Sequence, residues 1–402
     1  MSKEQVHVGL EIGTSKVCAV VALCRGATAP IRILGVGETP SCGVRKGDIL
    51  NFATASKCVH EALIDAEEKS DIQIESVYVA ITGSHLTSFN NRGGIELSDR
   101  KNEIDEDDLH DVELNAKEVS VPANQICLHT ILNHYYVDGT PGVVDPIGMI
   151  GKKLEADYHI VYGLSTKIQN TIRCVKEAGI EVEDVVISSI ASAQVVLKPH
   201  ETERGVIVLD IGGGITDYIV YINNVVRCSG TLAVGGDHLT QDIAIGLHIP
   251  PAHAEKLKCK EGSCKIDGLT PADTIVLKSD PSFNGCEIQR LWLNTILRVR
   301  VKEIFQIIAR KIATEHDFHT NCDSVVITGG TSKLQGIQAV ANEVFEIPTR
   351  LAFSHNVTGL TSSYENPSLS TPIGLVKYAQ ALYADNEAPS LASRFLSLFA
   401  RR

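Results

Sequence analysis

The stretch LDIGGGITD, residues 209–217, decides the fold that this chain can adopt. Apolar, β-branched residues lead into it and out of it, which is typical of two consecutive buried strands. Glycine permits φ > 0 and has no side chain, so a turn between the strands could aim several backbone N–H groups at a phosphate. The residues that would do so are Gly212, Gly213, Gly214 and Thr216. A simple β-hairpin with a glycine turn is the alternative for this motif alone.

The same design occurs near the N-terminus, in GLEIGTSKV at residues 9–17. Glu11 and Gly13 match Asp210 and Gly212 in position. A lysine and two hydroxyls, which supply charge and hydrogen-bond donors, replace the further glycines of the turn; they are Thr14, Ser15 and Lys16. Two such hairpins predict two similar halves that face each other across a cleft. Glu11 and Asp210 would then hold Mg²⁺ through water from opposite sides.

Two further glycine pairs precede helical patterns. In VVITGGTSKLQGI (325–337) a β-branched run ends at a glycine pair, and the next residues indicate a helix start. Such a strand–Gly–Gly–helix junction suits close packing against the sugar or phosphate of a nucleotide. The residues concerned are Gly329, Gly330, Thr331 and Lys333. AVGGDHLTQDIAIGL (233–247) places Gly235 and Gly236 before another helix, and neither segment matches a P-loop or a dinucleotide-binding fingerprint.

The amino-acid composition limits the classes of protein to which this chain can belong. The chain has 402 residues, of which 44% are apolar and 21% charged, as in an ordinary globular protein of several domains. Its net charge of −12 argues against broad nucleic-acid binding. The 11 cysteines include no CxxC pair, so we expect free thiols in a reducing cytosol. Neither a signal peptide nor an apolar run of about 18 residues is present, which predicts a soluble body.

The three loops resemble, in order and spacing, the two phosphate loops and the adenosine loop of the actin-like ATPase superfamily. Within it the chain is most similar to the FtsA family of bacterial cell-division proteins. The similarity covers nearly the whole chain and includes GVGETPSCGVRKGDILN (35–51), VYVAITGSHL (77–86), DPIGMIGKKLEADYHIV (145–161) and NVTGLTSSYENPSLSTPIGLVKYA (356–379). The resemblance implies an α/β fold of two actin-like lobes, an inserted small subdomain and a C-terminal amphipathic helix. It implies ATP and Mg²⁺ as cofactors.

The predicted domain boundaries lie where the pattern of strand-like, helical and acidic segments changes. The parts are a first-lobe core (1–82 with 166–199 and 371–385), an inserted interaction subdomain (83–165), a second-lobe core (200–243 with 316–370), a second-lobe outer subdomain (244–315), and a linker with a membrane-targeting helix (386–402). Within the insertion, the acidic run from Asp105 to Glu118 predicts a helix capped by Asp105. The resemblance implies that this subdomain binds later division proteins and neighbouring copies of the chain. The alternative for the acidic run is a solvated helix face.

Two helices of the outer subdomain carry further candidate residues. PPAHAEKLKCKEG (250–262) looks like the adenine-side helix of the superfamily, with Glu255 and Lys258 one turn apart, although a surface ion pair is the alternative. LWLNTILRVRVKEIFQIIARKIATE (291–315) is a long, locally basic amphipathic helix. The resemblance implies that it contacts the C-terminal tail of FtsZ through Arg300, and the acidic, apolar character of that tail suits a basic face. A solvated helix face is again the alternative.

The C-terminal segment SLASRFLSLFARR (390–402) follows a polar linker. At 100° per residue its leucines and phenylalanines form one broad arc, and at ~13 residues it is too short to cross a bilayer. It can lie among lipid headgroups with its arginines toward anionic lipid. The membrane-binding candidates are Leu391, Arg394, Phe395, Leu396, Leu398, Phe399, Arg401 and Arg402. A terminal helix packed on the core of the protein is the alternative.

The resemblance therefore implies a peripheral protein on the cytoplasmic face of the cell membrane, at the division septum. Such a protein would bind ATP, self-associate into filaments, tether FtsZ and recruit later division proteins. Asp217 lies where the superfamily positions the attacking water, which implies slow ATP hydrolysis at most. Two alternatives stay open: an FtsA-like pilus-assembly adaptor, and a sugar-kinase-type phosphotransferase, whose second substrate pocket the sequence does not show.

Overall fold

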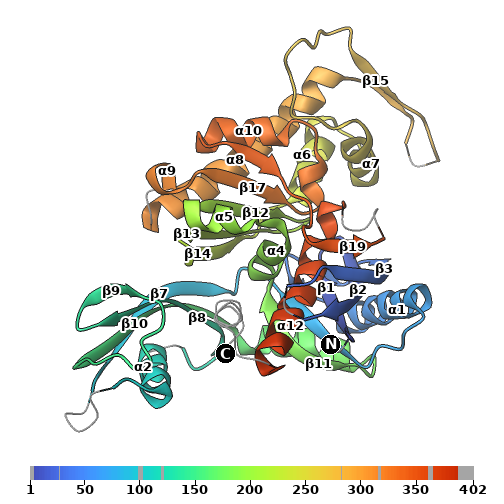
Figure 1. Ribbon diagram of the computed structural model, residues 1–402. Helices are drawn as coiled ribbons and strands as arrows, with labels where there is room; N and C mark the ends of the chain where they lie inside the picture. Colours follow the sequence, from blue (N-terminus) through green and yellow to red (C-terminus); the bar gives the residue numbers. More distant parts are fainter. Residues whose placement is uncertain are drawn as a thin grey trace.

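The computed structural model describes residues 4–387, except for residues 27, 98–102, 119–121, 282, 316–317 and 361–364. Two sheets form the centres of two lobes, a third sheet forms a separate subdomain, and helices cover the sheets (Figure 1). The predicted amphipathic tail at 390–402 lies outside the described residues. All 11 cysteines are free thiols, as expected.

The first-lobe sheet contains six strands. In spatial order they are β11 (Glu181–Ile187), β6 (Ser76–Ile81), β1 (Glu4–Ile12), β2 (Lys16–Arg25), β3 (Ile31–Pro40) and β19 (Val357–Gly359). β1, β2 and β3 are antiparallel, whereas β6 runs parallel to β1 and β11 runs parallel to β6. Helix α1 (Phe52–Ser70) packs on β2 and β3. The contact is so close that a Cβ at Gly37 would lie 2.0 Å from the carbonyl oxygen of Ala62, so only glycine fits there.

The second-lobe sheet repeats this pattern. Its order is β14 (Val225–Leu232), β13 (Thr216–Ile222), β12 (Val206–Ile211), β17 (Ser324–Thr328) and β18 (Thr349–Leu351). The first three strands are antiparallel and the last two run parallel to β12. The two hairpin turns close in the same way, through Gly13 N–H to Lys16 O at 3.0 Å and Gly212 N–H to Ile215 O at 2.9 Å. The predicted internal repeat is confirmed.

The inserted subdomain has its own sheet and hydrophobic core. The sheet order is β7 (Thr87–Glu96), β10 (Lys153–Leu164), β8 (Gln125–Val137) and β9 (Thr140–Val143). Helix α2 (Glu106–Lys117) packs against β7 and β10. Asp105 caps this helix in a capping box with Asp108, which confirms the predicted acidic helix.

The outer part of the second lobe is mostly helical. It comprises α6 (Gly236–Gly246), α7 (Pro251–Glu261), the hairpin β15 (Thr274–Leu277) and β16 (Cys286–Gln289), and α8 (Arg290–Glu315); α9 (Phe318–Asn321) and α10 (Ile337–Phe345) flank the core sheet. The long helix α8 buries its apolar side, including Leu297 and Phe305, against the second-lobe core. In Figure 1 the β15–β16 hairpin extends from the upper right of the molecule, opposite the inserted subdomain.

Four helices connect the parts: α3 (Ser165–Lys176), α4 (Ser188–Val196), α5 (Pro199–Arg204) and α12 (Ser370–Glu387). The helices α4 and α12 pack so tightly that a Cβ at Gly374 would lie 1.8 Å from Ala191 O. One predicted domain boundary needs correction, because Val357–Gly359 pairs with β3 in the first-lobe sheet although residues 316–370 were assigned to the second lobe. In the described part of the chain, no helix is long and apolar enough to span a membrane.

A candidate nucleotide cleft between the lobes

The glycine loops meet at a cleft of about 460 Å³ between the lobes. Nearly all of the residues predicted as nucleotide or metal ligands line it, together with Asp217, the predicted catalytic residue. They are Glu11, Gly13, Thr14, Ser15, Lys16, Asp210, Gly212, Gly213, Gly214, Asp217, Gly236, Glu255, Lys258, Gly329, Gly330, Thr331 and Lys333. The sequence therefore identified the walls of one real cavity.

Thr216 and Gly235 were also predicted as nucleotide ligands, but the structure does not place them in the lining. Thr216 is fully buried, and its hydroxyl donates to Val234 O at 2.8 Å. A Cβ at Gly235 would lie 2.7 Å from the carbonyl oxygens of both Gly212 and Gly213. These two residues support the turn from behind, because the alternation of β13 points Thr216 away from the cleft.

The reason for the glycines also differs from the expectation. None of Gly212, Gly213 and Gly214 adopts a positive φ, so backbone conformation does not require glycine there. Space does. A Cβ at Gly213 would lie 3.2 Å from Ser15 Cβ and 3.6 Å from Ser15 N, directly between the two hairpin turns. A Cβ at Gly214 would lie 2.5 Å from Thr14 Oγ1.

The helix α6 holds the glycine turn from its N-terminus. The N–H of Gly236 donates to Gly212 O at 3.0 Å, and that of Asp237 donates to Gly213 O at 2.7 Å. Thr331 Oγ1, which lies beside Gly236, donates to the same Gly212 oxygen at 2.9 Å. The second hairpin turn is therefore fixed by two other glycine loops before any ligand arrives, and such preorganisation lowers the cost of binding.

Three carboxyl groups form the floor of the cleft. Burial, with a smaller contribution from Asp210, raises the pKa of Glu11 to about 8. Burial also raises the pKa of Asp210 to about 6, although Thr371 Oγ1 donates to this carboxylate at 2.9 Å. The pKa of Asp217 is raised by burial to about 7. Crowded, poorly solvated carboxylates attract a cation, and carboxylate oxygens are ligands that Mg²⁺ prefers.

Hydroxyl groups from both lobes hold the carboxylate of Asp217. Thr82 Oγ1, just beyond β6, lies 2.9 Å and 2.7 Å from its two oxygens. Thr231 Oγ1, in the second lobe, donates to Oδ1 at 2.6 Å. The acid therefore bridges the lobes, and its oxygens are already engaged as hydrogen-bond acceptors.

The residues present fit a Mg²⁺-bound triphosphate. Thr14 Oγ1 is buried at the cleft without a hydrogen-bond partner in the described structure, so it is available to a phosphate oxygen. The glycines leave the space that a phosphate needs. Among the described residues, no group of three or more His, Cys, Asp or Glu side chains is arranged to hold a metal directly.

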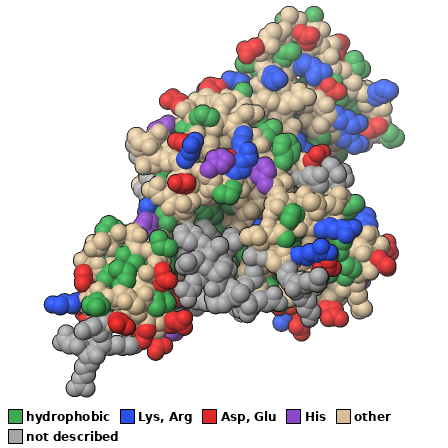
Figure 2. Space-filling view, viewed as in Figure 1, with side chains coloured by type: hydrophobic (Ala, Val, Ile, Leu, Met, Phe, Trp, Pro, Cys, Tyr) green, Lys and Arg blue, Asp and Glu red, His purple; other side chains and the backbone are tan. Residues whose placement is uncertain are grey.

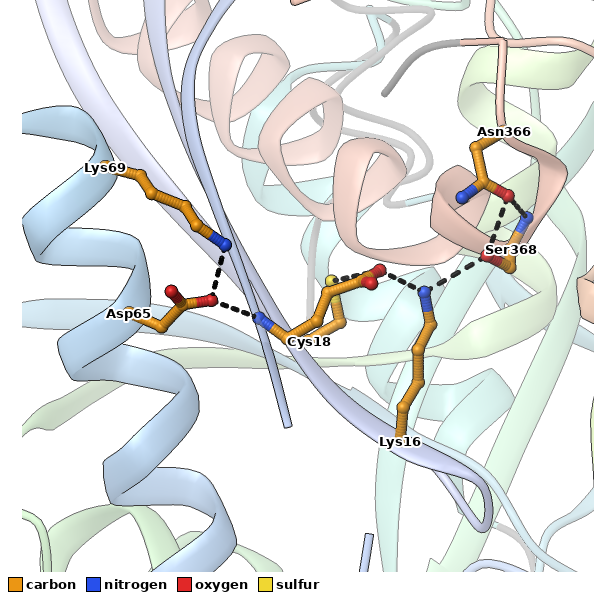
Figure 3. Close-up of polar contacts among 7 residues, drawn as sticks. Lys16, Cys18, Asp65, Lys69, Asn366 and Ser368 are labelled. Atoms are coloured by element: carbon orange, nitrogen blue, oxygen red, sulfur yellow. Dashed lines mark hydrogen bonds and ion pairs between the residues drawn. The ribbon is translucent and has the colours of Figure 1, made fainter. Parts of the chain in front are cut away.

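Lys16 is the cation of the first hairpin turn and lines the cleft. Its Nζ forms an ion pair with Glu38 and donates to Ser368 Oγ at 3.1 Å (Figure 3). Ser368 is oriented by Asn366, whose Oδ1 accepts from its Oγ at 2.8 Å and its backbone N–H at 3.1 Å. Lys16 thus connects the first hairpin with the segment before α12.

The predicted adenine-side pair, Glu255 and Lys258 of α7, also lines the cleft. Lys258 Nζ is 2.7 Å from Glu255 and donates to Gly236 O at 2.9 Å and Thr240 Oγ1 at 2.8 Å. With 13% of its side chain exposed, Lys258 is not the freely solvated partner that the surface-pair alternative requires.

The helix expected directly after Gly330 is instead a 3₁₀ turn, η1 (Gly330–Lys333), and α10 begins only at Ile337.

Sequence reasoning missed several cleft residues. Thr82, Ser188 and Thr371 line the cleft, as do Asp237, Cys259, Pro367 and Ser368. Thr82 lies within the quoted segment 77–86 and Thr371 within 356–379. Those segments carried a family resemblance, but no local pattern distinguished a cleft hydroxyl from a structural one.

Arg300 lies on α8, outside the cleft lining. Its guanidinium forms ion pairs with Asp242 of α6 and with Glu303, and 30% of its side chain is exposed. Two large apolar side chains of the same helix are also exposed, Trp292 at 61% and Val299 at 63%. Arg300 is therefore not a merely solvated residue, and its predicted contact with a partner stays a prediction.

Comparison with known proteins gives consistent matches along the chain. A family model described as "Cell division protein FtsA" matches residues 207–374, and one described as "SHS2 domain inserted in FTSA" matches residues 83–162. The cell division protein FtsA of Pseudomonas aeruginosa is 34% identical over 386 residues, which cover 96% of this chain and 92% of that protein. Its namesake in Escherichia coli K12 is 32% identical over 394 residues, covering 95% and 92%.

Solved structures share the fold. The PilM–PilN type IV pilus biogenesis complex gives a TM-score of 0.66 at 13% identity, covering 93% of this chain and 98% of the matched one. MreB5 of Spiroplasma citri bound to ADP gives a TM-score of 0.56 at 14% identity, covering 96% and 99%. The architecture is therefore actin-like, with the insertion at the place that the sequence predicted.

Proposed function

The chain belongs to the family of the cell division protein FtsA, and on that premise we propose that it binds Mg·ATP in the cleft and tethers FtsZ filaments to the cytoplasmic membrane. Its role in cell division follows from the family. The binding of Mg·ATP is proposed on one observation. Both hairpin turns, the Gly329–Gly330 loop and three carboxyl groups line the same cavity.

Several features support ATP as the ligand. The cleft has a lysine, a partnerless hydroxyl and turns without side chains at the two hairpins, and a polar cluster around Lys258. The carboxylates Glu11 and Asp210 would hold the hydrated Mg²⁺. Asp217 is committed to hydrogen bonds from Thr82 and Thr231, so we expect it to orient water weakly and hydrolysis to be slow.

Contact with FtsZ is assigned to α8 and α6. The basic, partly exposed Arg300 beside exposed Val299 offers a charge and an apolar surface to an acidic, apolar peptide. The intramolecular partners of Arg300, Asp242 and Glu303, hold the guanidinium in place and also compete with an incoming carboxylate.

Self-association is supported by the distribution of charge. Asp and Glu side chains gather at the lower left of Figure 2, over the inserted subdomain, whereas Lys and Arg gather at the upper right. The first turn of α2 in the inserted subdomain is acidic, with Glu106, Asp107 and Asp108, and α7 of the second lobe carries exposed lysines at 256 and 260. Complementary ends favour head-to-tail assembly of copies. The inserted subdomain would also meet later division proteins.

Membrane attachment is assigned to the tail at 390–402, on its sequence pattern alone. A single short amphipathic helix binds weakly, so a filament with many tails would bind far more tightly than one molecule. The protein would thus be peripheral, on the cytoplasmic face of the membrane at the division site.

A pilus-assembly adaptor is the second candidate, because the PilM–PilN complex shares the fold. Affinity for a peptide of the FtsZ C-terminal tail separates the two functions. We expect the full chain to bind the peptide and Arg300→Glu to bind it about 5- to 150-fold more weakly, because like charges then meet at a cost of about 1–3 kcal/mol. Arg300→Gln removes the attraction without adding repulsion toward Asp242 and should fall between them.

Lys311→Glu is the matched control, since it makes the same kind of charge change on an exposed position of α8. It should leave peptide affinity unchanged, and Mg·ATP affinity should survive in every variant. A chain that binds ATP but shows no affinity for the peptide would favour the adaptor. Equal peptide affinity in the parent and both Arg300 variants would remove Arg300 from the partner site.

A further inference from the structure

One acidic side chain reaches Lys16 from outside the lining of the cleft. Glu38 lies on β3, in register with Cys18 of β2, and its carboxylate is the ion-pair partner of Lys16. Both side chains are partly exposed, Lys16 at 25% and Glu38 at 42%. A carboxylate against the cation of an anion site opposes the charge of the ligand.

The position of Glu38 is fixed by α1. Its backbone N–H donates to Asp65 Oδ2 at 2.9 Å, and the same oxygen accepts from Lys69 Nζ at 2.7 Å (Figure 3). This anchor and the β2–β3 pairing fix the backbone of Glu38, and Cys18 Sγ lies 3.9 Å from the carboxylate oxygen that pairs with Lys16. The register of the folded sheet therefore brings the two side chains together.

Lys16 is shared with a third segment. Its bond to Ser368 Oγ ties it to residues 366–368, and Pro367 O accepts from Gly329 N–H at 3.2 Å. A phosphate that enters the cleft must compete with Glu38 for the ammonium group of Lys16. Since one lysine neutralises one charge, the carboxylate and the phosphate repel each other once both are close.

We propose that Glu38 is an internal counter-ion of Lys16 that competes with nucleotide phosphates and sets the affinity of the cleft. The proposal rests on the proposed binding of ATP. Mg²⁺ neutralises part of the triphosphate charge, so Glu38 disfavours Mg-free nucleotide more strongly than Mg·ATP. Glu38 thereby helps the cleft to select the metal-bound form.

The test is calorimetry on the full chain with Glu38→Gln, which keeps the shape of the side chain and removes its charge. We expect Mg·ATP to bind about tenfold more tightly and Mg-free ATP to gain more than that. Glu38→Ala should give the same direction if Gln at this position impairs folding. Glu61→Gln, which removes the exposed partner of Lys57 on α1, should change neither affinity.

The outcomes separate this inference from the proposed function. If the parent binds Mg·ATP and both Glu38 variants bind it equally or more weakly, Glu38 is not a competitor and the inference is wrong. Equal gains for the Mg-free and Mg-bound nucleotide would overturn the selection. Absence of ATP binding to the parent and to all variants would overturn the proposed function together with the inference.

Discussion

Replacement of Gly213 by Val tests the phosphate site directly. A Cβ at this position already lies 3.2 Å from Ser15 Cβ and 3.4 Å from Asp237 Oδ1, closer than the ordinary contact distance of about 3.5–4.0 Å. The two γ-methyl groups would extend further into the gap between the turns. Phosphate oxygens could then not approach the backbone N–H groups to hydrogen-bond distance, about 2.9 Å.

The expected loss follows from the number of contacts removed. Loss of two hydrogen bonds to a charged phosphate, at about 1.5–3 kcal/mol each, weakens binding by about 3–6 kcal/mol. That corresponds to a loss on the order of 10²–10⁴-fold in affinity. Stability should change much less, because Gly213 has no positive φ and the crowding falls at the edge of the cleft.

The assay is calorimetric titration of Mg·ATP into the parent and the variant, with thermal unfolding measured without nucleotide. Gly94→Val on β7 is the control, because it adds the same side chain to the inserted subdomain, where the flexible Glu155 side chain can move aside. The control should bind like the parent. If Gly213→Val binds Mg·ATP within threefold of the parent, phosphates do not lie between the two turns.

Further predictions concern acid stability and the tail. His7 is 7% exposed, and burial lowers its pKa to about 4, so below its ordinary pKa the unfolded chain takes up a proton that the folded chain does not. Between pH 7 and pH 5 this group alone should lower the free energy of unfolding by about 2 kcal/mol, whereas the raised pKa values of Glu11, Asp210 and Asp217 act in the opposite direction. In urea titrations the stability of the parent should therefore fall by about 2 kcal/mol relative to that of His7→Phe over this range. Deletion of 390–402 should leave cooperative unfolding intact and abolish sedimentation with anionic vesicles, and Phe395→Glu should do nearly the same; unfolding of the truncated chain would instead place the tail in the core. Replacing Arg394 and Arg401 by Ala should weaken vesicle binding by about 1 kcal/mol each, mainly at low salt, and salt-independent binding would argue against an electrostatic role.

The sequence predicted the repeat and the cleft because both depend on short local patterns. In each hairpin an apolar strand leads to an acid, Glu11 or Asp210, and two residues later to a glycine, Gly13 or Gly212, that begins the turn. The direction of Thr216 could not be predicted, since every residue of β13 is buried and no polar alternation marks its cleft side. The φ angles of the glycine turn could not be predicted either, because glycine adopts positive and negative φ about equally readily.

Other features depend on contacts between distant segments. The strand at 357–359 joins the first-lobe sheet, and Ser368 and Thr371 reach the cleft, only because the chain returns to β3 and to Asp210 after the second lobe is complete. The pairing of Glu38 with Lys16 requires the register of β2 and β3. No local pattern determines such a register in advance.

The central claim is that this chain links FtsZ to the membrane. The most direct measurement is flotation of fluorescent FtsZ filaments with anionic vesicles in the presence of Mg·ATP and the full chain. The account predicts that FtsZ floats only when the chain is present, and that either deletion of 390–402 or Arg300→Glu abolishes flotation. If the chain itself floats and FtsZ stays in solution, the chain binds membrane without tethering FtsZ, and the account is contradicted.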